Sequence, residues 1–193
     1  SACSSSAKAF AAAARAIAAG QCDAAVVGGV ETLCLTTLHG FASLELLSAQ
    51  PCRPCDEARD GISLGEAAAF ALLEPVDRSG EALALLGYGE SADAHHMSTP
   101  HPQGLGAVAA MRAALQSAHV AAQQVDYLNL HGTGTRNNDA AEDAAVRAVF
   151  GEGLACSATK GWTGHTLGAA GAVEAVITLL ALRHGFVPGT ANT

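Results

Sequence analysis

The chain has 193 residues, of which 50% are hydrophobic, and a formal net charge of −8 from 10 basic and 18 acidic residues. This length and apolar content are enough to bury a core, which excludes a disordered tail, and the acidic balance disfavours nucleic acid and anionic membranes as partners. Because no segment has the roughly 20 uninterrupted apolar residues that span a bilayer, and the N-terminus lacks the order of a signal peptide, we expect a soluble cytoplasmic protein.

The first 80 residues predict one helix followed by two buried strands. Residues 4–19 are rich in alanine, contain no glycine or proline, and are followed by a glycine, as is typical of a helix and its end. The short apolar runs 23–29 and 67–73 favour buried strands, the first of them in a parallel sheet. The segments between them predict a helical turn over 41–47 and a loop over 51–65.

The polar run 77–80 indicates a boundary, so we predict two domains, residues 1–80 and 81–193. Beyond it strands alternate with helices, which implies the α/β class and a parallel sheet with right-handed crossovers. No strand precedes the first helix and none follows the last, so we expect a piece of a longer protein. The predicted strands are 82–88, 126–130 and 154–158, and the predicted helices are 104–118, 139–149 and 167–183.

Cys3 lies in the run Ser-Ala-Cys-Ser-Ser-Ser at the start of the first predicted helix. The unpaired N–H groups and the dipole of a helix N-terminus favour a thiolate, which is the nucleophilic form of cysteine. Taken alone, a cysteine beside a serine cap is more often a small buried residue. The assignment therefore depends on the other motifs.

Two further motifs carry histidines. The stretch NLHGTGT at 129–135 runs from an apolar strand into a glycine-spaced loop, and open α/β sheets place ligands at the C-terminal ends of strands. A histidine at this point is also compatible with a purely structural hydrogen bond. The stretch SATKGWTGH at 157–165 places a lysine and a second histidine on either side of a turn into an alanine-rich helix.

Together, Cys3, His131 and His165 fit one chemistry. A cysteine can hold an acyl group as a thioester, and neutral imidazoles can donate hydrogen bonds to the thioester oxygen of a second substrate. Decarboxylation of that substrate would leave a stabilised enolate. Its carbon could then attack the acyl-cysteine.

The motifs ACSSS, HGTGT followed by Asp139 and Glu142, and TK-x-x-TGH-x-x-GAAG resemble, in order and separation, the β-ketoacyl synthases of the thiolase superfamily. The DAAVVGG strand, the RP-x-D-x-x-RDG-x-x-x-GE stretch and the DAHHM loop are also similar, so the resemblance covers essentially the whole chain. It implies an α/β thiolase-like fold, layered α-β-α-β-α in the full protein. This chain would hold the later part of the N-terminal half and most of the C-terminal half, without its last strands.

The resemblance also implies a role for each motif residue. The cysteine is the acyl acceptor, the two histidines serve decarboxylation and the enolate, and the lysine orients the site electrostatically. No metal or resident cofactor is implied, because the substrates are carried on the phosphopantetheine of an acyl carrier protein. The implied catalytic residues are Cys3, His131, His165 and Lys160, with Glu142 in support and Thr133 and Thr135 binding the pantetheine arm.

By this resemblance we expect a decarboxylative Claisen condensation of an acyl group on Cys3 with malonyl-acyl carrier protein, elongating a fatty-acid, polyene or polyketide chain. The expected partners are an acyl carrier protein and a second subunit, either another copy or a related ketosynthase-like chain. Two alternatives stay open: a ketosynthase domain of a multienzyme, and a non-catalytic partner subunit, against which the intact Cys3 argues. Gly161 and Trp162 depart from the family pattern and leave substrate length open.

Three other patterns are interpreted as structural. Cys52-Arg-Pro-Cys55 has CxxC spacing, but the second pair that a zinc site requires is absent from the sequence. The histidines at 95, 96 and 101 fall in a proline-containing loop and are not assigned to a metal. The glycines at 104 and 106 follow no predicted strand, as a dinucleotide fingerprint would require.

Overall fold

The computed structural model describes residues 1–76, 83–96 and 98–193. The chain packs into two compact units, and each unit combines separate stretches of sequence. The predicted boundary at the polar run 77–80 lies outside the described residues. Unit 1 comprises Ser1–Leu38, Leu64–Ala84 and His165–Phe186, and unit 2 comprises His39–Ser63, Leu85–Gly164 and Val187–Thr193.

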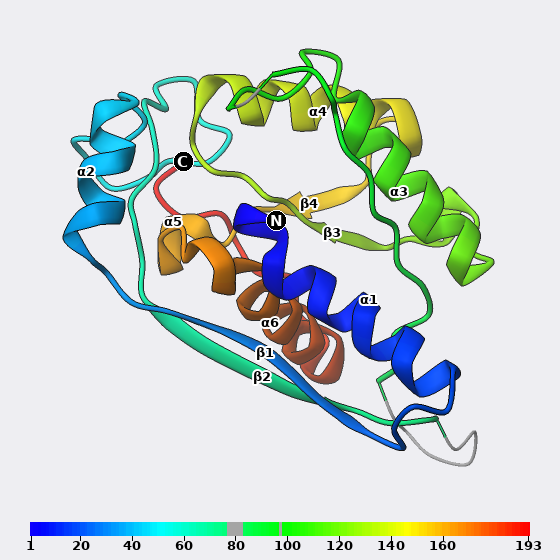
Figure 1. The fold of residues 1–193 in the computed structure, drawn as a ribbon. Coiled ribbons are helices and arrows are strands. Elements are labelled where there is room, and N and C mark those ends of the chain that lie inside the picture. The colour runs from blue at the N-terminus through cyan, green and yellow to red at the C-terminus, as the bar shows by residue number, and fades with distance from the viewer. Residues whose placement is uncertain (77–82, 97) are drawn as a thin grey trace. The chain divides into compact units, whose positions relative to one another are not determined.

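Unit 1 contains a two-stranded antiparallel sheet with two helices packed on it. β1 (Ala25–Glu31) pairs with β2 (Ala67–Leu73) along their whole length. The helices α1 (Ser5–Ala18) and α6 (Ala170–His184) contact this sheet and each other (Figure 1). Both strands form close to where the sequence predicts them, but the prediction of a parallel first strand is wrong.

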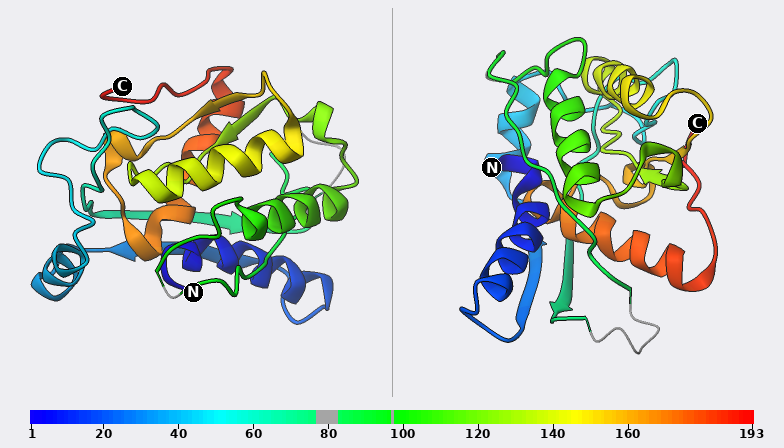
Figure 2. Two further views of the ribbon diagram at one scale, coloured as in Figure 1. Left: turned by 90° about the horizontal axis from the view of Figure 1, so that it is seen from above. Right: turned by 90° about the vertical axis from the view of Figure 1, so that its right-hand side faces the viewer.

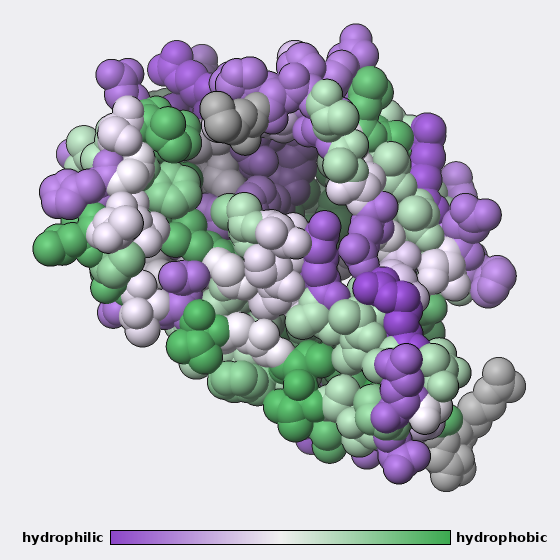
Figure 3. All heavy atoms as spheres, viewed as in Figure 1, coloured by the Kyte–Doolittle hydropathy of each residue, from purple (hydrophilic) through white to green (hydrophobic). Residues whose placement is uncertain are grey.

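The β1–β2 sheet buries one face and exposes the other. Val27 is buried on the covered face, toward the helices. Continuous apolar runs are typical of strands that are covered on both faces, and on that basis both strands were expected to be buried. In the structure this expectation holds for one face of the sheet only. Figure 3 shows apolar side chains gathered over this pair of strands. Those on the open face belong to Val26, Val30, Phe70 and Leu72, each 59–73% exposed.

Small residues let α1 and α6 approach closely. A Cβ added at Gly171 would lie 2.6 Å from the Cβ of Ala7 on the facing helix. The buried Ser6 hydroxyl accepts a hydrogen bond from the Ala172 N–H at 2.9 Å. The two helix N-termini are therefore joined directly.

The segment Leu167–His184 is, among the described residues, the one helix long and apolar enough to cross a membrane by length and composition alone. A core helix of a soluble protein passes the same test. In unit 1 this segment supplies α6, which contacts α1, β1 and β2. About 22% of the segment is buried, and its buried residues include Ala170, Ala172 and Ala181.

Unit 2 contains a short parallel sheet and a pair of helices. β3 (Tyr127–Asn129) and β4 (Ala155–Ser157) pair in parallel and are joined through α4 (Arg136–Phe150), as in a β-α-β unit. α3 (Leu105–Ala118) lies beside α4 (Figure 2). The predicted parallel order is confirmed for these two strands. The other short elements of the described chain, in either unit, are η1 (Ala2–Ser4), α2 (Leu35–Ser43), η2 (Ala122–Gln124), α5 (Lys160–Thr163) and η3 (Leu167–Ala169).

Helices were predicted better than the shorter elements. Those over 4–19, 104–118 and 167–183 are confirmed to within a few residues, and α4 begins three residues before its predicted start at 139. The turn predicted over 41–47 is misplaced, because the chain is already helical from Leu35. The described part of the strand predicted over 82–88 forms no strand, because it pairs with no other strand in the part of the chain that the structure describes.

We predict that Gly171→Ala lowers the free energy of unfolding by about 1–3 kcal/mol, because the added methyl group overlaps Ala7 in a closely packed helix pair. The measurement is urea unfolding of the whole protein. Gly40→Ala is the matched control, because Gly40 lies in α2 with no atom within 4 Å of its added Cβ. That substitution should raise stability by up to about 1 kcal/mol. Equal effects of the two substitutions would contradict the packing argument.

Candidate active site

The first part of the candidate site, in unit 1, is a contact between Cys3 and His165. The Sγ of Cys3 lies 3.1 Å from Nε2 of His165. Cys3 belongs to η1, which leads into α1, and His165 lies two residues before η3, which leads into α6. His165 is buried, whereas Cys3 is partly exposed. The packing of the two helix N-termini thus joins residues that are 162 positions apart.

Backbone groups hold the His165 imidazole and determine its tautomer. The Leu167 N–H donates to Nδ1 of His165 at 3.3 Å. The Gly65 N–H donates to the His165 carbonyl at 3.0 Å, so the residue is also tied to the chain before β2. Because Nδ1 accepts a hydrogen bond, the proton of the neutral imidazole lies on Nε2. His165 therefore presents an N–H group to Cys3.

The turns on both sides of this contact have strained backbone. Ala2, before Cys3, has a φ of 46°, and Leu167 has a φ of 43°. Non-glycine residues rarely adopt such angles, and those that do cluster at functional sites. The Glu31 carboxylate, at the end of β1, accepts the Gly168 N–H at 3.1 Å and anchors the second turn. Glu31 could not be assigned from the motifs, and the available signal was an acid at the end of an apolar strand.

The second part of the site, in unit 2, joins His131 to Lys160. Lys160 is 1% exposed, and its Nζ lies 2.6 Å from the His131 carbonyl and 3.2 Å from His131 Nδ1. A lysine ammonium can only donate, so His131 Nδ1 accepts and the proton of the neutral imidazole lies on Nε2. Lys160 thus positions the His131 backbone and selects the tautomer.

Glu142 on α4 holds the same loop through its backbone. Its two carboxylate oxygens accept the N–H groups of His131, at 2.6 Å, and Gly132, at 2.8 Å. Burial raises the pKa of Glu142, and the two N–H donors and the nearby Lys160 ammonium oppose that rise. The side chain also lines a cavity of about 380 Å³, together with Cys156 and other residues of unit 2.

The threonines of the motif follow His131 in a loop that requires glycine. The Oγ1 atoms of Thr133 and Thr135 lie 2.9 Å apart, and the Thr135 N–H donates to Thr133 Oγ1 at 3.3 Å. Gly132 and Gly134 have φ values of 41° and 77°, and an added Cβ on Gly132 would overlap Ala158. The glycine spacing in the sequence therefore reflects both backbone conformation and close packing.

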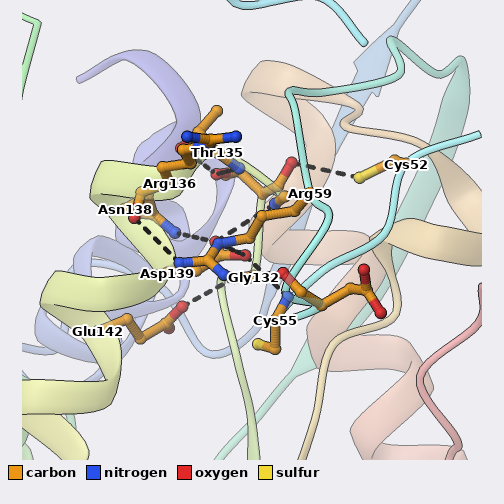
Figure 4. A network of polar contacts seen from close by, with 12 residues as sticks. Cys52, Cys55, Arg59, Gly132, Thr135, Arg136, Asn138, Asp139 and Glu142 are labelled. Carbon is orange, nitrogen blue, oxygen red and sulfur yellow. Dashed lines mark hydrogen bonds and ion pairs between the residues drawn. The ribbon is translucent and has the colours of Figure 1, made fainter. Parts of the chain in front are cut away.

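Asp139 joins the motif loop to the segment that holds the CxxC pattern (Figure 4). Its buried carboxylate accepts the N–H groups of Cys55, at 2.8 Å, and Gly134, at 3.3 Å. The Arg59 guanidinium lies 3.6 Å away and pairs with it. Cys55 is an exposed residue, but partial desolvation of its thiol and the nearby Asp139 carboxylate raise the pKa of the thiol to about 11, so it stays protonated near neutral pH. Sequence reasoning gave Asp139 no role of its own.

The structure thus groups the predicted site residues in two clusters. Each cluster holds one imidazole whose Nδ1 accepts a hydrogen bond and whose Nε2 carries the proton. One cluster adds a thiol, and the other adds a buried cation, a carboxylate and two hydroxyls. Unit 1 holds Cys3 and His165, and unit 2 holds His131, Lys160, Glu142, Thr133 and Thr135.

Comparison with known proteins identifies the family of the chain. The family model described as "Beta-ketoacyl synthase, N-terminal domain" matches residues 1–79, and "Beta-ketoacyl synthase, C-terminal domain" matches residues 83–193. The chain is 40% identical over 195 residues to 3-oxoacyl-[acyl-carrier-protein] synthase 2 of Coxiella burnetii, a match that covers 93% of this chain and 47% of the relative. It spans about half the length of the curated relatives it matches.

Solved structures show the same likeness. A ketosynthase in complex with its chain length factor, from Xenorhabdus doucetiae, matches with 49% identity and a TM-score of 0.91, over 95% of this chain and 45% of that one. A type II PKS acyl-carrier protein in complex with its ketosynthase matches with 29% identity and a TM-score of 0.88, over 93% and 48%. The two family models cover almost every residue, and the chain belongs to the β-ketoacyl synthase family.

Proposed function

We propose that the whole protein is a β-ketoacyl synthase that elongates an acyl chain by decarboxylative Claisen condensation with malonyl-acyl carrier protein. The observation that carries the proposal is the Cys3–His165 contact of 3.1 Å, in which the imidazole offers an Nε2–H group to the sulfur. A hydrogen-bond donor beside a cysteine stabilises negative charge on sulfur and prepares it for acyl transfer. The family membership and the second imidazole support the same reaction.

The first half-reaction transfers an acyl group to Cys3. Its Sγ attacks the carbonyl carbon of an acyl thioester on the carrier protein, forming a new C–S bond. The old C–S bond breaks, and the pantetheine thiolate leaves and takes up a proton. The His165 Nε2–H supports the sulfur as a charged nucleophile before the attack.

The second half-reaction makes the carbon–carbon bond. The malonyl thioester loses carbon dioxide, and the electrons of the broken C–C bond move into an enolate. The Nε2–H groups of His131 and His165 donate to the enolate oxygen, where negative charge develops. The enolate carbon attacks the acyl-Cys3 carbonyl, and the Cys3 thiolate leaves. Lys160 keeps Nδ1 of His131 an acceptor, so that imidazole remains a donor at Nε2 throughout.

The proposal includes the carriers and partners of the reaction. The hydroxyls of Thr133 and Thr135 would receive the phosphopantetheine arm, and neither a metal nor a resident cofactor is needed for these steps. The solved ketosynthases with an acyl-carrier protein and with a chain length factor support two partners here. These are an acyl carrier protein and a second subunit, either another copy or a ketosynthase-like chain, in the cytoplasm.

The first prediction from this function concerns acylation of Cys3. Incubated with an acyl-carrier protein thioester, the whole protein should gain one acyl mass, and Cys3→Ala should gain none, because the acceptor sulfur is lost. Intact-protein mass spectrometry measures the gain. Addition of malonyl carrier protein should then release ketoacyl product from the wild type only. A folded wild type that takes up no acyl group would favour the non-catalytic subunit.

Cys34 supplies the matched control for that experiment. It is exposed, and hydrogen bonds with Thr37 lower the pKa of its thiol, so it is prone to acylation without catalysis. Cys34→Ala should keep the full enzymatic acylation seen in the wild type. Acyl mass that disappears with Cys34 rather than with Cys3 would contradict the assignment of the nucleophile.

A second prediction separates activity from stability at Glu142. Glu142→Gln has one acceptor oxygen for the two N–H groups of His131 and Gly132, so the loop loses a contact and turnover should fall about tenfold or more.

Burial raises the folded-state pKa of Glu142 above its ordinary 4.5, so the folded state binds this proton more tightly. The wild type should therefore lose stability as pH rises through that pKa, and the variant should lack this loss.

Urea unfolding at several pH values between 4 and 8 measures the difference. Glu152→Gln is the control, because Glu152 lies exposed beyond the other end of α4 and pairs with Arg147 at the surface. It should keep the wild-type turnover and the wild-type pH profile of stability. Parallel pH profiles for the wild type and Glu142→Gln would contradict the role given to burial.

A further inference from the structure

The thiol, the N–H and the carbonyl of Cys52 each make a hydrogen bond. It is buried, and its thiol donates a hydrogen bond to the Thr133 carbonyl at 3.2 Å. Its N–H donates to Ser63 Oγ at 3.1 Å, and its carbonyl accepts from Asn192 Nδ2 at 3.0 Å. Figure 4 shows the thiol pointing toward the loop that carries Thr135. The residue is thus a rigid support beneath this loop.

The same stretch of loop is clamped at consecutive backbone groups. The Gly61 N–H donates to the Gly134 carbonyl at 3.1 Å, and the Gly134 N–H donates to Asp139. A Cβ added at Gly134 would lie 2.7 Å from Cys52 Sγ, so the sulfur touches the loop directly. The Cys52 thiol adds a hydrogen bond to the Thr133 carbonyl, and the hydroxyl of Thr133 lies beside that of Thr135.

The Cys52 thiol is suited to remain a donor. Burial raises its pKa, so the sulfur keeps its hydrogen near neutral pH. A thiolate could not donate to a carbonyl and would repel the carbonyl oxygen. A protonated, enclosed thiol of this kind serves as a small hydrogen-bonding side chain and not as a nucleophile.

We propose that Cys52 is a positioning residue for the carrier-bound substrate. Its thiol orients the Thr133 carbonyl, and thereby the Thr133 and Thr135 hydroxyls that would receive the pantetheine arm. The inference rests on the proposed function and adds to it a residue outside the motif. The first cysteine of the CxxC pattern then contributes to substrate binding, with neither metal nor redox chemistry.

The test compares Cys52→Ala with Cys52→Ser in the whole protein. Cys52→Ala removes the donor, and the KM for malonyl-acyl carrier protein should rise about three- to tenfold, the effect of one lost hydrogen bond, with kcat little changed. Cys52→Ser returns a donor and should recover most of the wild-type KM. The rate at which iodoacetamide alkylates Cys3 should stay at the wild-type value in both variants, because this reagent needs no pantetheine contact.

Cys22→Ala controls for loss of a thiol, because Cys22 lies in the turn after α1 and has been given no part in the site. It should leave KM and kcat unchanged. Three outcomes would overturn the inference. Cys52→Ala could keep the wild-type KM, Cys52→Ser could fail to recover the wild-type KM, or the variants could lose kcat and Cys3 alkylation together. Wild type that forms no ketoacyl product would overturn the proposed function as well.

Discussion

Burial of the Lys160 ammonium is the constraint on which the rest of the unit 2 cluster depends. A buried cation is costly unless it is paired and hydrogen-bonded, and Lys160 meets the carbonyl and Nδ1 of His131 within 3.2 Å. Glu142 lies near this cation, and its carboxylate accepts the N–H groups of His131 and Gly132. The cation, the imidazole and the carboxylate therefore define one another's positions. The loop that they hold needs glycine at 132, where φ is 41° and an added Cβ would overlap Ala158.

Unit 1 reaches the same chemical result without a lysine. There a backbone N–H occupies Nδ1 of His165, and a turn with a positive φ at Leu167 brings that group into place. The turn is stabilised by its surroundings, because α6 packs closely on α1 and Glu31 accepts an N–H of the turn. Two different devices thus leave each imidazole with its proton on Nε2. That shared state leaves each histidine able to donate a hydrogen bond from Nε2, as the proposed reaction requires.

Local sequence predicted the helices well and the sheets less well. The alanine-rich segments that became α1, α3 and α6 carry strong helix preference along their length, so their own residues determine them. The apolar runs of β1 and β2 were placed well, but their antiparallel pairing and one open face were not foreseen. An apolar run reports burial without reporting which strand lies beside it or in which direction. The described part of the strand predicted over 82–88 forms no strand for the same reason, because propensity does not supply a partner strand.

The sequence by itself predicted the chemistry of the candidate site, because the proposed reaction depends on residue types in ordered motifs, and Cys3, His131, His165 and Lys160 could be named from them. It also determined the need for glycine around Thr133. Only the tertiary structure decided the tautomers, the anchoring by Glu31 and Asp139, and the support from Cys52. For the anchors and for Cys52 the physical reason is distance along the chain: these hydrogen bonds join residues as far as 81 and 137 positions apart, and only folding brings their atoms within reach. The tautomer of His165 depends instead on the conformation of a turn, because its donor is the N–H of Leu167, two residues away.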